Sequence, residues 1–277
     1  MGGADSAGRP RVRAVERADA GAVTRPSWVS AFLDLAPAAW ECGIAFWAQA
    51  SGTTLSALRG DDREFGSLLP ASGDDHLRVQ RLADGESRVH LDLHVDDPLA
   101  AAEAAVELGA AVRHRSEHGY VVLDSPGGLP FCFVAHRAEV RSRPVTWPGG
   151  HTSLVDQVCL DIGPDRFEDE VSFWTALTGW ERGTSAVSGS FVPLVRPTGQ
   201  PLRFLLQRTD DPRPRTGAHL DLATTDRAAE TERHVALGAV VVASYPLWTV
   251  LRDPAGLAYC LTDRDPETGV LPTPPAP

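Results

Sequence analysis

One four-residue segment with metal-binding side chains occurs twice in the sequence. It reads His-Leu-Asp-Leu at 90–93 and again at 219–222. The leucines alternate with the polar residues, which is typical of a strand that buries one face and turns the other face away from the core. A histidine and an aspartate on that second face can line a ligand site, or they can simply hydrogen-bond to each other, which fixes the histidine tautomer.

Two cysteines show the same repetition. Phe131-Cys132 follows the first segment and Tyr259-Cys260 follows the second. An ionised cysteine can bind zinc or another soft metal, whereas a cysteine between apolar residues often behaves as a small buried hydrophobic side chain. The four cysteines of the chain form no CxxC pair, which argues against a zinc ribbon. We therefore expect free thiols and a reducing, cytoplasmic setting.

Both features belong to a longer internal repeat. Five pairs of matching segments occur in the same order, 127 to 129 positions apart. The other three pairs are Phe46-Trp47 with Phe173-Trp174, Gln80-Arg81 with Gln207-Arg208, and Leu108-Gly109-Ala110 with Leu237-Gly238-Ala239. The chain is therefore predicted to contain two related domains.

Composition around the repeats predicts the boundaries of these domains. Proline and glycine are concentrated between the two halves, and prolines are frequent at the end of the chain. We expect a flexible tail over 1–26, domain 1 over 27–137, a linker over 138–151, domain 2 over 152–265 and a Pro-rich tail over 266–277.

Each domain is predicted to contain two modules of one strand, one helix and further short strands. In domain 2, the stretch from Leu154 to Ile162 alternates like a strand, a helix follows from Pro164 to about Thr178, and the pattern restarts at Ala218. In domain 1, Asp97 can cap the second helix, Pro98 suits its first turn and Gly109 can end it. A helix on one side of a sheet requires an apolar sheet face there, so the histidines lie on the opposite face.

The order of these segments resembles the vicinal oxygen chelate superfamily. The closing Asp-Pro-Ala-Gly-Leu-Ala-Tyr-Cys-Leu at 253–261 adds to a likeness with its glyoxalase-like branch, which is common in high-GC bacteria. The resemblance covers about 27–265 and implies an α+β fold of tandem glyoxalase-like domains. Each domain would then hold two βαβββ modules that form one cupped mixed sheet, with helices on its outer face. Members of the superfamily chelate a substrate through a divalent metal in the cup, or bind drugs such as bleomycin without metal.

The resemblance also implies positions for metal ligands. In domain 2 they fall on Gln157, Gln207, His219 and Cys260; in domain 1 they fall on Ser30, Gln80, His90 and Cys132. Cysteine replaces the usual final glutamate in both domains, which argues against a glyoxalase isomerisation because that reaction needs a carboxylate base beside the metal. The two histidines and one glutamate of an extradiol dioxygenase are also absent. We expect the better site in domain 2, holding zinc, nickel, manganese or iron, or no metal at all.

Five residues are further candidates for contact with a small-molecule ligand. Tyr120 and Trp248 occupy matching places in the two domains, and their rings could stack on a planar ligand. The other three are Tyr245, Asp221 and His90. Three functions remain open: a metal-dependent enzyme of lyase, isomerase or dioxygenase type, a metal-free protein that sequesters an aromatic, cationic compound, and a scaffold in which one or both cups are degenerate.

The overall composition excludes other classes of function. The formal net charge is −11, so no basic surface is available to offset the phosphates of a nucleic acid. No apolar run approaches the roughly 20 residues of a membrane span. We expect a small-molecule partner, and either a monomer whose two domains mimic a dimer or a homodimer.

Overall fold

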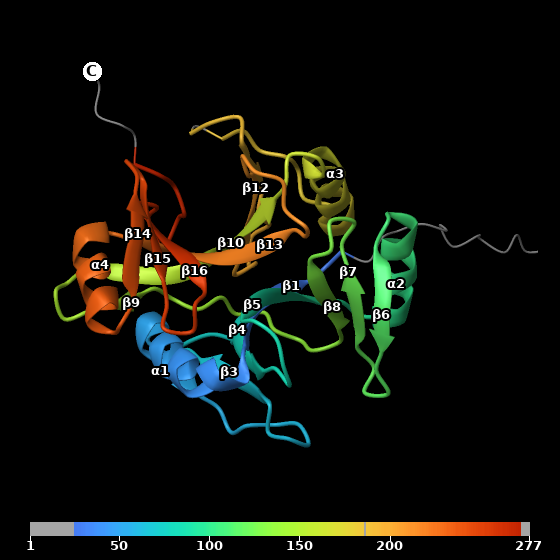
Figure 1. Cartoon of the computed structure of the whole chain (residues 1–277), viewed down its shortest axis with the longest axis horizontal. Helices are drawn as coiled ribbons and strands as arrows, with labels where there is room; N and C mark the ends of the chain where they lie inside the picture. Colours follow the sequence, from blue (N-terminus) through green and yellow to red (C-terminus); the bar gives the residue numbers. More distant parts are fainter. Residues whose placement is uncertain (1–24, 186, 273–277) are drawn as a thin grey trace, which may run out of the picture.

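The computed structural model describes residues 25–185 and 187–272. Two eight-stranded mixed sheets and four α-helices follow one another along the chain (Figure 1). The predicted fold class, tandem α+β domains with cupped sheets, is therefore confirmed. Residues 1–24 of the predicted N-terminal tail and residues 273–277 of the Pro-rich tail lie outside the described residues. Within the described ranges, no helix is long and apolar enough to cross a membrane.

Domain 1 forms the first sheet. Its first module contains β1 (Trp28–Leu35), the 3-10 helix η1 (Pro37–Ala39), α1 (Trp40–Ser51), β2 (Thr54–Leu55), β3 (Phe65–Leu69) and β4 (Leu77–Arg81). Its second module contains β5 (Arg88–His94), α2 (Pro98–Glu107), β6 (Ala111–Arg115), β7 (Val121–Asp124) and β8 (Pro130–Val134). The strand order is β2-β3-β4-β1-β5-β8-β7-β6, so the modules meet where β1 and β5 pair antiparallel.

Domain 2 repeats this arrangement in the second sheet. Its first module contains β10 (Thr152–Ile162), α3 (Phe167–Thr178), β11 (Phe191–Leu194) and β12 (Arg203–Arg208). Its second module contains β13 (Gly217–Thr224), α4 (Arg227–Ala236), β14 (Val240–Ser244), β15 (Trp248–Arg252) and β16 (Ala258–Thr262). The order is β11-β12-β10-β13-β16-β15-β14. The predicted linker contributes β9 (Val145–Thr146), which pairs with the start of β10. The modules of each sheet come from one domain.

The strand alternation and helix ends follow the sequence pattern. In β5, Leu91 and Leu93 are fully buried in the core between the two sheets, and His90 and Asp92 point to the other face. The side chain of Asp97 accepts hydrogen bonds from two amides of the first turn of α2. Gly109 has a φ of 105°, a conformation that other residues rarely adopt, so it ends the helix as expected. The helix α3 begins at Phe167 instead of Pro164, because residues 164–166 form a turn.

The first helix of each domain packs against the other domain. Figure 1 shows α1 beside β16, and α3 beside β7 and β8. Phe46 and Trp47 of α1 pack on Tyr259 with ring centroids 5.8 and 5.3 Å away, and Trp47 Nε1 donates to Asp253 Oδ2. In the equivalent place, Trp174 of α3 packs on Phe131 at 5.4 Å. The core residues of both domains consequently form one cluster, with β5 and β13 in contact at its centre.

The contact of α4 with α1 and the linker is strongly polar. Arg233 donates to the carbonyls of Gln49 and Ala50 at the end of α1, and its guanidinium lies 3.4 Å from the ring centroid of Trp147. Its partner is Glu230, a fully buried residue that also interacts with His151 at 2.8 Å. The equivalent positions in α2 hold alanines, so the interface between α2 and α3 lacks this network.

Candidate metal and ligand site

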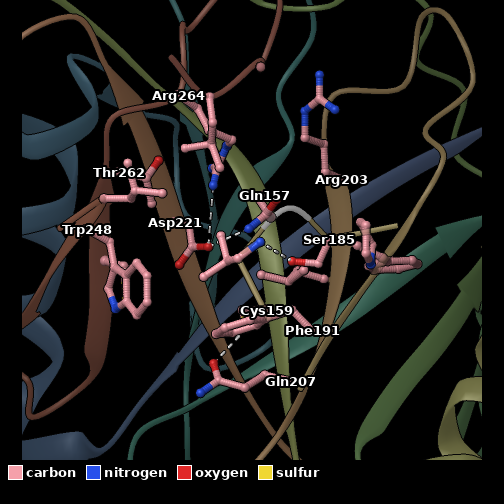
Figure 2. A pocket seen from close by; sticks show the side chains of 18 of the residues that line it. Gln157, Cys159, Ser185, Phe191, Arg203, Gln207, Asp221, Trp248, Thr262 and Arg264 are labelled. Carbon is pink, nitrogen blue, oxygen red and sulfur yellow. Dashed lines mark hydrogen bonds and ion pairs between the residues drawn. The ribbon is translucent and has the colours of Figure 1, made fainter. Parts of the chain in front are cut away.

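Cup 2 is a cavity of about 390 Å³ on the face of the second sheet opposite the core. The structure brings most of the sequence-derived candidates together here (Figure 2). Six of them line the cavity, namely Gln157, Gln207, His219, Cys260, Asp221 and Trp248. Tyr245 does not line it; this side chain is half exposed and stacks on the outside of Trp248, with ring centroids 4.7 Å apart.

His219 is the centre of a tight polar group in cup 2. Its Nδ1 lies 3.0 Å from Asp161 Oδ2. Its Nε2 lies 3.3 Å from Asp221 Oδ1 and 3.6 Å from Cys260 Sγ. Because β10, β13 and β16 are neighbours in the sheet, three strands supply these groups. A histidine held by a carboxylate on one nitrogen, with the other nitrogen facing further donors, is the arrangement of many metal sites.

The spacing of these donor atoms fits a tetrahedral metal such as zinc. Zinc bonds of about 2.0–2.1 Å to nitrogen or oxygen and about 2.3 Å to sulfur imply roughly 3.4 Å between N and O ligands and roughly 3.6 Å between N and S ligands. The observed separations are 3.3 and 3.6 Å. The donor atoms of His219, Asp221 and Cys260 all lie within 4.8 Å of one another, so these three side chains could hold such an ion together.

The carboxylate of Asp221 presents its two oxygens to different partners. Oδ2 accepts a hydrogen bond of 2.6 Å from Gln157 Nε2 and lies 3.8 Å from Arg264 Nη1, and Figure 2 shows both side chains turned toward it. Oδ1 is buried, forms no hydrogen bond with the described residues and lies 3.3 Å from His219 Nε2. A buried carboxylate oxygen is costly unless a cation pairs with it. Without metal the protonated imidazole of His219 is that cation, and a metal ion that displaces the Nε2 proton would pair with the same oxygen.

The same surroundings determine the protonation of the site. Burial opposes a charge on His219, but the adjacent carboxylate of Asp161 outweighs it and raises the pKa of His219 well above its usual value. Burial also raises the pKa of the Cys260 thiol. Without metal, the group therefore holds an imidazolium between two carboxylates, next to a neutral thiol. To bind, a metal ion must displace the Nε2 proton of His219 and the thiol proton of Cys260.

Gln207 pairs with a different cysteine of cup 2. Its Oε1 accepts from Cys159 Sγ at 3.4 Å, next to Asp161 on β10. Burial raises the pKa of Cys159 to about 12, so this thiol is neutral. Of the four predicted ligands, His219 and Cys260 belong to the donor group. Gln157 supports the group by donating a hydrogen bond to Asp221, and Gln207 accepts a hydrogen bond from Cys159 instead.

Sequence reasoning missed several functional residues. Asp161 and its counterpart Asp34 were not proposed as partners of the histidines, although Asp161 alternates with Gln157 and Cys159 on the inward face of β10 and lies 127 positions after Asp34. Although neither domain has a glutamate at the final ligand position, carboxylates are present in both cups, since each histidine contacts two aspartates. Arg203 and Arg264 also line the cavity, and the internal repeat could not predict them. Domain 1 has His76 and His136 at the equivalent positions.

Cup 1 is the corresponding cavity of domain 1, with a volume of about 350 Å³. Gln80, His90, Tyr120 and Cys132 all line it. Ser30 does not: its hydroxyl lies 2.6 Å from His94 Nε2, and the residue is fully buried. Phe32 lines the cavity and stacks on the imidazole of His90, with ring centroids 4.6 Å apart.

The sequence matches one family model twice, at residues 30–134 and 157–262. The model describes the glyoxalase-like domain. The chain belongs to this glyoxalase-like family. The two matches coincide with the two sheets, so both domains of the structure are glyoxalase-like domains, and the resemblance to the vicinal oxygen chelate superfamily is confirmed. No curated protein sequence matches the chain.

Solved structures with the same fold include a synthase, a glyoxalase and a dioxygenase. A variant of 4-hydroxymandelate synthase from Streptomyces coelicolor has a TM-score of 0.59 at 16% identity, over 90% of this chain and 94% of that one. The Mn(II)-bound glyoxalase from Novosphingobium aromaticivorans has a TM-score of 0.59 at 16% identity, over 91% and 88%. A halotolerant catechol dioxygenase has a TM-score of 0.55 at 13% identity, over 86% and 87%. At identities of 13–16%, these similarities show a shared fold.

Proposed function

We propose that this glyoxalase-like protein is a metal-dependent enzyme, a lyase or an isomerase, that transforms a small organic substrate in cup 2. The observation that carries the proposal is the convergence of three donor atoms in cup 2: His219 Nε2 lies 3.3 Å from Asp221 Oδ1 and 3.6 Å from Cys260 Sγ, separations that suit ligands of one zinc-like ion. A bound metal would act as a Lewis acid that polarises an oxygen of the substrate.

The residues around this group have distinct roles in the proposal. Asp161 keeps the Nδ1 proton on His219 and so holds the ring with Nε2 toward the donors. Gln157 and Arg264 fix the Asp221 carboxylate from the other side. Trp248 and Phe191, whose rings meet edge to face at 6.0 Å, provide an apolar wall for the body of the substrate. The cup therefore suits a molecule with an apolar or aromatic part and an oxygen-bearing end.

The donor set favours Lewis-acid chemistry over oxygen activation. Non-haem iron dioxygenases use two histidines and one carboxylate with open positions. Among the described residues that line cup 2, His219 is the one histidine and no glutamate is present. A thiolate ligand instead favours zinc or another borderline-soft ion.

Metal analysis of the full chain tests the proposal. The protein is stripped with a chelator, incubated separately with zinc, nickel, manganese and iron, and freed of unbound metal. We expect stoichiometric metal that is lost from cup 2 in His219→Ala and kept in His114→Ala, a matched change at an exposed histidine. Absence of bound metal after all four incubations would contradict the proposal.

A metal-free binding function is the second candidate, and the aromatic wall of cup 2 is the observation in its favour. Arg203 and Arg264 line the same cavity and disfavour a cationic ligand. A thermal-shift screen of planar aromatic compounds on chelator-treated protein tests this function. A stabilising compound that loses its effect in Trp248→Ala but not in Tyr245→Ala would support it; no shift with any compound would contradict it.

A further inference from the structure

Cup 2 has a positively charged end, where Arg203 and Arg264 line the cavity. Figure 2 shows both arginines at one end and Gln207 at the other, and the strand agrees, because Arg203 and Gln207 lie near opposite ends of β12. Both arginines lie beside the fully buried carboxylate of Asp156. Arg264 Nη2 donates to its Oδ1 at 2.6 Å, and Arg203 Nε lies 3.4 Å from its Oδ2.

More positive charge surrounds Asp156 than its carboxylate can balance. Two further arginines contribute to it: burial, and then the charges of Arg203 and Arg141, lower the pKa of Arg196 to about 10. Among the described residues, the ion pairs of these four arginines involve two carboxylates, those of Asp156 and Asp221. Uncompensated charge in a partly buried place is costly, and an anionic group in the cavity would offset it.

The two arginines that line the cavity have donors left for such a group. The side chain of Arg203 is 25% exposed, and its one hydrogen bond to a described residue runs from Nη2 to the carbonyl of Thr268 at 2.5 Å. Arg264 Nη1 lies 3.8 Å from Asp221 Oδ2, which is too far for a hydrogen bond. A guanidinium group binds carboxylate or phosphate oxygens through its planar set of N–H donors.

The strand pairing places this charged end in one row with the proposed metal ligands. Arg203 pairs with Gln157, and Gln157 pairs with Asp221. Asp221 pairs in turn with Cys260. Neighbouring strands are about 4.8 Å apart, so the backbones of Arg203 and Asp221 are roughly 10 Å apart. A compact molecule can therefore reach the arginines with one end and the donor group with the other.

The fold itself does not require these charges. Domain 1 has the same arrangement of modules, but Val29 stands at the position of Asp156, and histidines stand at the positions of the two cavity-lining arginines. The charged end is consequently a feature of cup 2 alone.

We infer that the substrate of cup 2 carries an anionic group, a carboxylate or a phosphate, which Arg203 and Arg264 bind. The inference deepens the proposed function and rests on it for the other end of the substrate, the oxygen that faces the donor group. Binding of the anionic group at the arginines orients the substrate along the row, with its apolar part against Trp248 and Phe191.

Binding of three small aromatic probes to the chelator-treated full chain tests the inference. Benzoate and phenyl phosphate carry the two anionic groups, and benzamide is an uncharged molecule with nearly the shape of benzoate. By isothermal titration calorimetry, we expect at least one anion to bind roughly 10-fold or more tightly than benzamide, because hydrogen bonds to charged groups are the stronger ones. The anion that binds more tightly identifies the group. This comparison needs no variant.

Arg203→Met tests the residue and leaves the buried pair of Arg264 with Asp156 in place. We expect the affinity for the preferred anion to fall by roughly 10-fold or more and the affinity for benzamide to stay the same. Arg115→Met, a matched change at an exposed arginine of domain 1, should alter neither. If Arg203→Met does not fold, as judged by circular dichroism, Arg203→Gln replaces it.

The remaining outcomes separate this inference from the proposed function. Equal affinities for the three probes, or no binding of either anion, would overturn the inference and leave metal binding in cup 2 untouched. Anion binding that survives unchanged in the Arg203 variant would also overturn it. Failure of the chain to bind any metal would contradict the proposed function, whereas a preference for the anions would still stand.

Discussion

The two cups have the same chemical centre in different surroundings. Each centre holds a histidine, two aspartates and a cysteine at matching positions of the repeat. In cup 1 the stacked ring of Phe32 covers the histidine, while in cup 2 the equivalent position holds Cys159 and the aromatic wall stands farther out, at Trp248 and Phe191. The comparison shows that the two domains share these polar side chains and differ in the aromatic side chains around them.

The largest expected difference concerns the arginines that neutralise the aspartates. Arg264 Nη2 donates to Asp156 at 2.6 Å, and Asp156 is fully buried, so Arg264→Met leaves a buried carboxylate with one fewer cation. We expect the free energy of unfolding to fall by about 3 kcal/mol, measured by urea denaturation. In cup 1, the side chain of Arg88 is 53% exposed, so Arg88→Met is expected to cost less than about 1 kcal/mol. Equal costs would contradict the expectation that the buried ion pair carries the larger stabilisation.

Acid sensitivity should originate mainly beside cup 1. Burial lowers the pKa of both His76 and His94 to about 4, and the equivalent positions in domain 2 hold Arg203 and Ala223. Between pH 6.5 and 4 the unfolded chain binds more protons at these histidines than the folded chain does, so stability is lost as the pH falls through this range. Each histidine contributes up to roughly 3 kcal/mol, at about 1.4 kcal/mol per pKa unit.

Urea denaturation at pH 7 and pH 5 measures this effect. A His76→Gln/His94→Gln variant should lose less stability than the native sequence between the two pH values. Glutamine does not titrate and can still donate to the carbonyl of Val155, as His76 Nε2 does at 2.9 Å. Parallel losses in the two proteins would show that other groups carry the acid sensitivity.

The two aspartates that contact the Nδ1 atoms of the histidines, Asp161 in cup 2 and Asp34 in cup 1, should differ in their effect on zinc binding in cup 2. Partners that orient a metal-binding histidine contribute roughly 10- to 100-fold to metal affinity. Asp161→Asn should therefore weaken zinc binding in cup 2 by about that factor, and Asp34→Asn should leave it unchanged. Competition with a chromophoric chelator measures the affinity. An equal loss in the two variants would contradict a role of Asp161 in orienting His219.

The smallest effect is expected from replacing Gln157 of domain 2 with the residue type at the equivalent position of domain 1. Gln157→Ser gives cup 2 the residue that cup 1 has at Ser30, and removes the hydrogen bond to Asp221 Oδ2. Arg264 remains near this oxygen, so we expect zinc affinity in cup 2 to fall by roughly tenfold at most. The same chelator competition checks this value. A complete loss of metal would mean that Gln157 itself is a ligand.

The sequence predicted the repeated part of this architecture well. The duplicated His-Leu-Asp-Leu segments gave the position of His90 and His219, and the alternation of leucines gave the correct buried faces. Contacts that break the repeat were not predictable. Asp156 lies at a β-bulge in β10, where the equivalent residue of β1 is Val29, and no periodic pattern indicates that Arg264 and Arg203 converge on it.

The packing of α1 and α3 on opposite domains has a consequence for how the chain can be divided. A half that contains 25–144 alone would expose Phe46 and Trp47, and the complementary half would expose Trp174 and Phe173, because each half supplies the surface that covers the other. Cleavage within the linker should thus give a nicked protein whose fragments stay together. Arg233 of α4 donates hydrogen bonds to the carbonyls of Gln49 and Ala50 in α1, and these bonds would help to hold the two fragments together.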